Sequence, residues 1–323
     1  MISSLKKNKS GQLDTSFGWL FAIVVGGFIL FLAIFGVMKF INIQKTVQSA
    51  ETGKSISVLL NPLETGFESG EKVLISSSVE TRIIMQCDTQ GTFGKQKIQT
   101  LQKSLGDWSD TGVNIVLKNK YIFSNTSLEG ESFYAFSKPY EFPVENDYDS
   151  AFKIADLIYL TSADEIYCFY NPPSDIETEL GNLNIENILI DSCTTKGTKV
   201  CFDSGESNCD IKVGYDSGTI IKNSTKMYFD GDALMYAAIF STPEIYECQV
   251  ERFMKRANLL LQLYYEKNRI ESIQGCSSDV ASSLNQLSVI IDNYENSSSL
   301  VSVSDAAKKL NKLNGNAGDC KLW

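Results

Sequence analysis

The hydrophobic pattern begins with one long apolar segment near the start of the chain. From Phe17 to Met38 no side chain is charged. At about 1.5 Å rise per residue, a helix of this length crosses the roughly 30 Å hydrocarbon core of a bilayer, and lipid requires that its backbone be bonded internally. A cleaved signal peptide has a shorter apolar part of about 7–15 residues. We therefore predict an uncleaved transmembrane helix over residues 17–40.

Lysines on the two sides of this segment predict its orientation. The amino-terminal side holds three of them and the following side holds one close to the segment: Lys6, Lys7 and Lys9, then Lys39. Positive residues favour the cytoplasmic face, so we expect residues 1–16 to form a cytoplasmic tail and the bulk of the chain to lie outside the cell membrane. Apolar residues at spacings of three and four continue beyond the membrane, which predicts a helical stalk over residues 41–54.

A pattern of period two then dominates and predicts a sheet-rich extracellular domain over residues 55–241. Its clearest example lies between Glu71 and Cys87, where one face is apolar: Val73, Ile75, Val79, Ile83, Met85 and Cys87. This alternation is typical of a long half-buried strand or a bent pair of strands. Shorter apolar runs and turn residues through residue 229 predict further strands and hairpins, with some helix.

The last part of the chain returns to a helical period, so we predict a three-helix segment over residues 242–323 packed on the sheet-rich domain. Thr242-Pro243-Glu244 has the signature of a helix start, with a capping hydroxyl, a first-turn proline and an acidic residue. One helix is expected over residues 243–271, and two shorter ones follow it. The fold class is therefore α+β.

Eight cysteines lie beyond the apolar segment: Cys87, Cys168, Cys193, Cys201, Cys209, Cys248, Cys276 and Cys320. Their even number and one-sided placement predict disulfides in an oxidising compartment. An unbroken helix over residues 243–271 puts Cys248 and Cys276 roughly 40 Å apart, too far for a bond. We predict a Cys276–Cys320 disulfide and a bond from Cys248 to the sheet-rich domain, and the other pairings stay open.

Charge and composition exclude several classes of function. The net charge is −10, and because residues 1–40 hold four lysines and one aspartate, the remainder carries −13. Such an acidic domain disfavours nucleic acid and anionic lipid as its partners. The chain has no histidine, which excludes histidine-based triads and His-ligated zinc or haem. We predict no catalytic residue, no cofactor and no small-molecule substrate.

Two acidic patterns could suggest chemistry, but simpler interpretations are preferred. The sequence GYDSGTII, with Asp216, resembles an aspartic-protease loop, and similar tripeptides begin at Asp110 and Asp203. Asp, Ser and Gly are also the residues of tight turns, so we interpret all three as turns. The acidic runs 145–149 and 230–232 lack the spacing of an EF-hand, so we predict no metal site.

Two kinds of surface feature suggest modification and association. The tripeptides beginning at Asn125, Asn223 and Asn296 are acceptor sequences for asparagine glycosylation. Small residues fall on one ridge of the apolar segment, which favours close packing of helices in lipid: Gly18, Ala22, Gly26 and Ala33. The expected partners are membrane lipid and other copies of the chain or other surface proteins.

The segment KKNKSGQLDTSFGWLF, residues 6–21, resembles the amino terminus of archaeal type IV pilin-like proteins. The resemblance implies cleavage between Gly11 and Gln12 and an apolar helix that forms a filament core. The acidic residue usual at the fifth mature position is replaced by Ser16, and Asp14 falls two residues after Gln12. The rest of the chain is similar to uncharacterised archaeal single-pass surface proteins.

The leading hypothesis is a non-enzymatic, single-pass membrane protein whose outer domain is an interaction or assembly module at the cell surface. The alternative is a pilin-like filament subunit processed at Gly11-Gln12. A third hypothesis, a hydrolase on the outer face, requires a catalytic pair built without histidine.

Overall fold

We analysed a computed structural model of the chain. It describes residues 18–40, 72–104, 106–109, 113–142, 152–191, 193, 196–203, 208–276 and 280–323. The chain divides into two compact units, Met1–Gln48 and Ser49–Trp323. The predicted tail over residues 1–16 and stalk over residues 41–54 lie outside the described residues.

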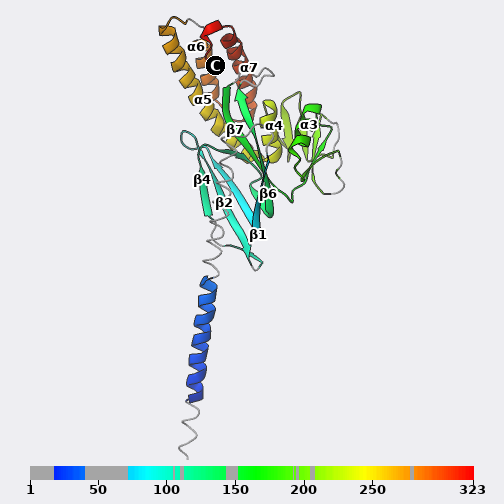
Figure 1. Cartoon of the computed structure of the whole chain (residues 1–323), viewed down its shortest axis with the longest axis vertical. Helices are drawn as coiled ribbons and strands as arrows, with labels where there is room; N and C mark the ends of the chain where they lie inside the picture. Colours follow the sequence, from blue (N-terminus) through cyan, green and yellow to red (C-terminus); the bar gives the residue numbers. More distant parts are fainter. Residues whose placement is uncertain are drawn as a thin grey trace, which may run out of the picture. The chain divides into compact units, whose positions relative to one another are not determined.

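The described part of the first unit is a single helix, Gly18–Phe40, coloured blue in Figure 1. It has 23 residues and is long and apolar enough to cross a membrane. Its side chains are exposed along its whole length. The predicted apolar helix is therefore confirmed, as either a membrane anchor or a signal sequence.

The second unit begins with a seven-stranded sheet, formed by β1 to β7. The strands are Lys72–Asp88, Lys95–Ser104, Asp107–Trp108, Val113–Leu117, Tyr121–Phe123, Ser127–Phe142 and Phe152–Ser162. Their order is β3-β2-β1-β6-β7-β5, with β4 also paired to β2. All pairs are antiparallel except β5 with β7. The long strand predicted from residue 71 is confirmed as β1, with an irregularity in its pairing to β6 between Ser76 and Thr81.

The central strands of this sheet are buried on both faces. On β7, Ile158 packs into one hydrophobic cluster, whereas its neighbour Tyr159 packs into a second one, and both are fully buried. Ile122 and Tyr121 on β5 divide in the same way. The first cluster contains the inward residues of β1 and β2, and the second contains the helices. The sequence in the middle of a central strand such as β7 is therefore a continuous run of apolar residues, without alternation.

A six-stranded mixed sheet follows, formed by β8 to β13. The strands are Tyr167–Tyr170, Ile188–Ile190, Thr198–Phe202, Ile211–Gly214, Thr219–Lys222 and Thr225–Tyr228. The order is β13-β12-β11-β10-β8-β9. Strands β9, β8, β10 and β11 are parallel, and β11 to β13 form antiparallel hairpins. Helix α3, Ser174–Leu183, provides the crossover that the parallel pair β8 and β9 requires.

Helix α4, Gly231–Phe240, lies in the centre of the second unit. All residues from 233 to 240 are buried, and the helix contacts β6, β7 and β12. A helix that is apolar on every side has no amphipathic period, so its sequence contains no signal that separates it from a buried strand. The sequence-based prediction accordingly included this segment in a sheet-rich region.

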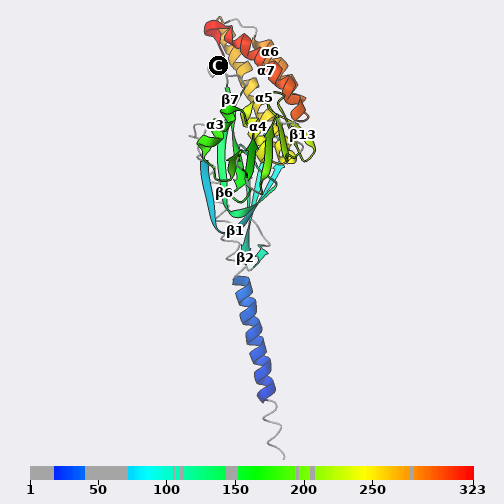
Figure 2. The ribbon, with the colours of Figure 1, turned by 90° about the vertical axis from the view of Figure 1, so that its right-hand side faces the viewer.

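The predicted three-helix segment is confirmed as α5 (Pro243–Ile273), α6 (Val280–Asp292) and α7 (Leu300–Gly315), with short 3-10 turns at Ser297–Ser299 and Gly318–Cys320. Figures 1 and 2 show the three helices side by side. Pro243 and Glu244 occupy the first turn of α5 as expected. The predicted capping hydroxyl is wrong, because Thr242 Oγ1 is buried without a hydrogen-bond partner.

Candidate functional site

Four disulfides hold the second unit together. Cys276 bonds Cys320 and Cys248 bonds Cys87 on β1, with Cα separations of 5.6 and 6.1 Å, so both predicted connections are confirmed. The remaining pairs, which the sequence left open, are Cys168 with Cys193 and Cys201 with Cys209. No cysteine is free.

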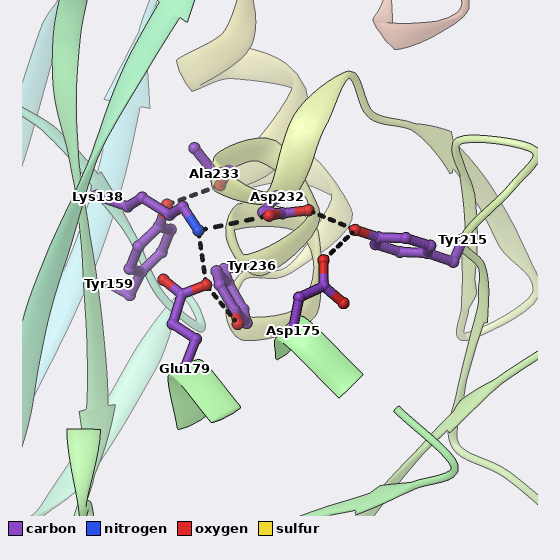
Figure 3. A network of polar contacts seen from close by, with 8 residues as sticks. All are labelled: Lys138, Tyr159, Asp175, Glu179, Tyr215, Asp232, Ala233 and Tyr236. Atoms are coloured by element: carbon purple, nitrogen blue, oxygen red, sulfur yellow. Dashed lines mark hydrogen bonds and ion pairs between the residues drawn. The ribbon is translucent and has the colours of Figure 1, made fainter. Parts of the chain in front are cut away.

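A polar network joins the two sheets through helices α3 and α4, as Figure 3 shows. Its centre is Lys138 on β6, whose Nζ lies 2.6 Å from Glu179 Oε2 on α3 and 3.5 Å from Asp232 Oδ2 on α4. Tyr236 on α4 donates to the same Glu179 oxygen at 3.3 Å, and the ammonium lies 5.5 Å from the centre of the Tyr236 ring. The Lys138 ammonium thus forms ion pairs with two carboxylates and a cation–π contact with one aromatic ring.

The network continues to the turn between β11 and β12. The hydroxyl of Tyr215 lies 3.0 Å from Asp232 Oδ1 and 3.3 Å from Asp175 Oδ2. A phenol has one proton, so both carboxylates share one donor. Burial first, and then the charges of Asp232 and Asp175, raise the pKa of Tyr215 above its usual value. Tyr215 therefore remains neutral and connects α3 to α4.

A second buried cluster surrounds Lys222 at the end of β12. Its ammonium donates at 2.8 Å to the carbonyl oxygens of Ile239 and Ser241, which end helix α4. Burial lowers the pKa of Lys222 to about 8, against the opposing charge of Glu165. A cation at the carboxyl end of a helix satisfies orphan carbonyls and complements the helix dipole. Lys222 is thus a structural cap for α4.

Arg252 on α5 is fully buried although it carries a charge. Its guanidinium donates to the carbonyl oxygens of Phe93, Lys118 and Lys120 at 3.2, 2.8 and 3.1 Å, and to Gln249 Oε1 at 2.5 Å. These carbonyls belong to two loops of the first sheet. Arg252 therefore ties both loops to the long helix, close to the Cys87–Cys248 disulfide.

A groove with a volume of about 590 Å³ lies between β1 and β6, where the pairing of these two strands is interrupted. Five carboxylates line it: Glu80, Glu129, Glu131, Asp164 and Glu186. Two of them are paired, Glu129 with Arg82 at 2.7 Å and Glu80 with Lys103 at 2.7 Å. Both cations lie over the ring of Trp108. Within the described ranges, no cluster of acidic or cysteine side chains could hold a metal ion.

The motifs that suggested protease chemistry are in turns where they are described. Asp216, Ser217 and Gly218 connect β11 to β12, and Gly218 has a φ of +60°. Ser217 Oγ donates to Gly214 O within that turn. Asp203 follows β10 with a φ of 43°. Asp110 and the acidic run over residues 145–149 lie outside the described residues.

The three glycosylation tripeptides differ in their surroundings. Asn223 is exposed in the hairpin turn between β12 and β13, with a φ of 51°. Asn296 is also exposed, and its Oδ1 accepts the backbone N–H of Ser298 at 3.0 Å. Asn125 is half-buried, and its Nδ2 lies 3.3 Å from both carboxylate oxygens of Glu165. Only Asn125 must give up tertiary contacts to be modified.

The predicted packing ridge lies on the Gly18–Phe40 helix. All four residues, Gly18, Ala22, Gly26 and Ala33, are exposed along it. A Cβ placed on Gly18 or Gly26 meets nothing within 4 Å. The ridge is available to a second helix.

Sequence reasoning missed the charged residues that organise the interior, although each carried a visible signal. Lys138 interrupts the apolar run FYAFSKPYEF, Lys222 ends the strand TIIK, and Arg252 lies between the core residues Val250 and Phe253. A lone cation in an apolar stretch indicates a buried partner, but the sequence does not say which.

No known protein family, curated protein or solved structure matches the chain. The geometry alone therefore defines the class: an α+β protein with a disulfide-bonded domain and, in the part of the chain that the structure describes, one candidate membrane helix.

Proposed function

We propose that the chain is a non-enzymatic, single-pass membrane protein, anchored by residues 17–40, whose outer domain is an interaction or assembly module at the cell surface. One observation carries the proposal: the chain combines an exposed apolar helix of membrane length with a second compact unit in which every cysteine is disulfide-bonded. Structural disulfides persist in oxidising compartments and are rare in the cytosol. The acidic outer part agrees with a solvated surface domain.

Two fractionation measurements test the anchor and the compartment. The protein is expected to stay with membranes after a carbonate wash and to show no free thiol under denaturing, non-reducing conditions. Release by carbonate, or eight reduced cysteines, would overturn the proposal.

Labelling with a membrane-impermeant thiol reagent tests the orientation. Because no native cysteine is free, an added one is the only target. Asn223→Cys, in the exposed turn between β12 and β13, is expected to react in intact cells. Ser4→Cys, in the predicted cytoplasmic tail, is expected to react only after permeabilisation. The reverse pattern would show the domain inside the cell.

A pilin-like filament subunit is the second candidate, and it is favoured by Gly11-Gln12 shortly before the apolar helix that begins at Gly18. Sequencing the amino terminus of the mature protein separates the two. A start at Met1 or Ile2 supports the permanent anchor, whereas a start at Gln12 supports processing and assembly into a filament.

A further inference from the structure

Helix α5 has two apolar faces, and among the described residues only one of them is packed against the rest of the chain. The inner face packs into the core and includes Val250, Phe253, Ala257 and Leu261, all at most 1% exposed. On the opposite face, Leu263, Ile270 and Ile273 are 65%, 54% and 80% exposed. Figures 1 and 2 agree in showing α6 and α7 on one side of α5.

The spacing of the outer face matches a helix-pairing seam. Leu263, Glu266, Ile270 and Ile273 follow one another at intervals of three, four and three residues. Alternation of three and four keeps side chains on the line where two helices cross at a shallow angle. Single exposed apolar residues are ordinary, but three large ones in one line along a helix indicate a surface that binds a partner.

The seam is symmetric about the level of residue 268, which favours a second copy of the same helix as its partner. In an antiparallel pair with its two-fold axis at that level, Leu263 lies opposite Ile273 of the second copy, and Glu266 lies opposite the second copy's Ile270. A two-fold contact of this kind uses the same patch on both copies.

Charge selects the antiparallel arrangement. Glu266 and Arg269, 54% and 67% exposed, form an ion pair on this face at 2.9 Å. In the antiparallel register, Glu266 of each copy comes within one residue of the level of Arg269 on the other, so opposite charges meet twice. A parallel pair in register would place Glu266 against its own counterpart, which is unfavourable.

We propose that residues 263–273 of α5 bind the same residues of a second copy as an antiparallel helix pair centred at the level of residue 268. This inference rests on the proposed function and names the partner of the outer domain. The contact is short, and tethering in one membrane supplies the high effective concentration that such a short seam requires.

Cysteine cross-linking of the full-length protein in membranes tests the partner and the direction. Two differently tagged copies carry Leu263→Cys and Ile273→Cys, and mild oxidation is expected to join them efficiently. Leu263→Cys alone is not expected to join to itself, because the two positions would be about 15 Å apart along the axis and a disulfide needs Cα atoms within about 7 Å. Val301→Cys, at an apolar site on α7 that is 56% exposed, provides the background.

Three results would overturn the inference. Self-linking of Leu263→Cys without the mixed product shows a parallel pair. Mixed products no stronger than the Val301→Cys background show that the copies do not meet here. Linkage to a different protein assigns the seam to a foreign helix.

Substitutions on the seam provide a readout independent of oxidation. Leu263→Asp with Ile270→Asp is expected to weaken self-association at least tenfold while the thermal unfolding stays unchanged, because both side chains are exposed in the single chain. Val301→Asp is the matched control. Glu266→Arg is expected to weaken the contact, and adding Arg269→Glu restores it.

Failure of this inference is distinguishable from failure of the proposed function. If carbonate washing and thiol labelling give the expected results and the seam variants still associate like the wild type, the anchored module stands and assembly uses another surface.

Discussion

Cys87, near the end of β1, and Cys248, in the second turn of α5, are joined by a disulfide across 161 residues of sequence, with their Cα atoms 6.1 Å apart. The bond fixes the long helix to the end of β1, an interior strand of the first sheet, beside the loops that Arg252 holds. Helix α5 is therefore fastened by a covalent bond and a buried cation at its amino-terminal half, while its other half carries the proposed pairing seam.

Removal of this disulfide should destabilise the protein more than removal of Cys201–Cys209. The first closes a loop of 161 residues and the second a loop of 8. In the chain-entropy account, the double Cys→Ser changes cost about 5 and about 2.5 kcal/mol of unfolding free energy, respectively. Denaturant unfolding of the detergent-solubilised protein measures both. Equal losses would show that strain or residual structure outweighs loop entropy.

Arg252→Met should lower the free energy of unfolding by about 3–5 kcal/mol. The side chain is fully buried, and its loss leaves loop carbonyls such as those of Lys118 and Lys120 without their donor. Lys309→Met is the control, because Lys309 is exposed on α7 and its loss should change stability by about 0.5 kcal/mol or less. Similar small effects for both variants would contradict the clamping role of Arg252.

Stability should rise as the pH increases from about 8 towards 9.5. In the folded state the pKa of Lys222 is lowered to about 8 from 10.5, so between these values the unfolded chain binds more protons. Excess protons on the unfolded chain make stability increase with pH, by at most about 3 kcal/mol for a shift of this size. Above pH 10 the unfolded chain ionises tyrosines such as Tyr159, whose pKa burial raises, and stability falls again.

Thermal unfolding at a series of pH values measures the effect. Lys222→Met should remove the rise, and Lys226→Met, at an exposed position on β13, should retain it. A wild-type curve that is flat or falls between pH 8 and 9.5 would contradict the buried ammonium.

If the host glycosylates asparagine, the three sites should be used unequally. Asn223→Gln and Asn296→Gln should each remove one glycan from the intact mass, because both side chains are exposed. Asn125→Gln should leave the mass of glycan unchanged, because the Asn125 amide is half-buried against Glu165. A glycan at Asn125 would mean that modification precedes folding of this region.

Local patterns were enough for much of the architecture. The alternation around Ile83 predicted β1, and the helical stripe that includes Phe253 predicted α5. Both patterns exist because one face of each element is buried and the other is exposed to solvent. The Cys276–Cys320 bond also followed from sequence, since the length of a continuous helix fixes how far apart its ends lie. Where a helix is buried on every side, as α4 is, the amphipathic pattern that would identify it disappears.

The partners of the buried charged residues in the candidate site could not be predicted from the sequence. Lys138 meets Glu179 across 41 residues, and Lys222 meets the carbonyl of Ser241 only because β12 packs against α4. Nothing in the sequence near either lysine specifies its partner, because the pairing depends on how separate elements pack.

The sequence by itself determined the apolar helix, the acidic character of the rest of the chain, the disulfide chemistry and the three carboxyl-terminal helices, because each depends on composition or on a repeat within one element. Only the tertiary structure decided the parallel strands, the remaining cysteine pairs, the clamps at Lys138, Lys222 and Arg252, and which face of α5 remains exposed. Those features depend on contacts between segments that are distant in the sequence, and such contacts form only when the chain folds.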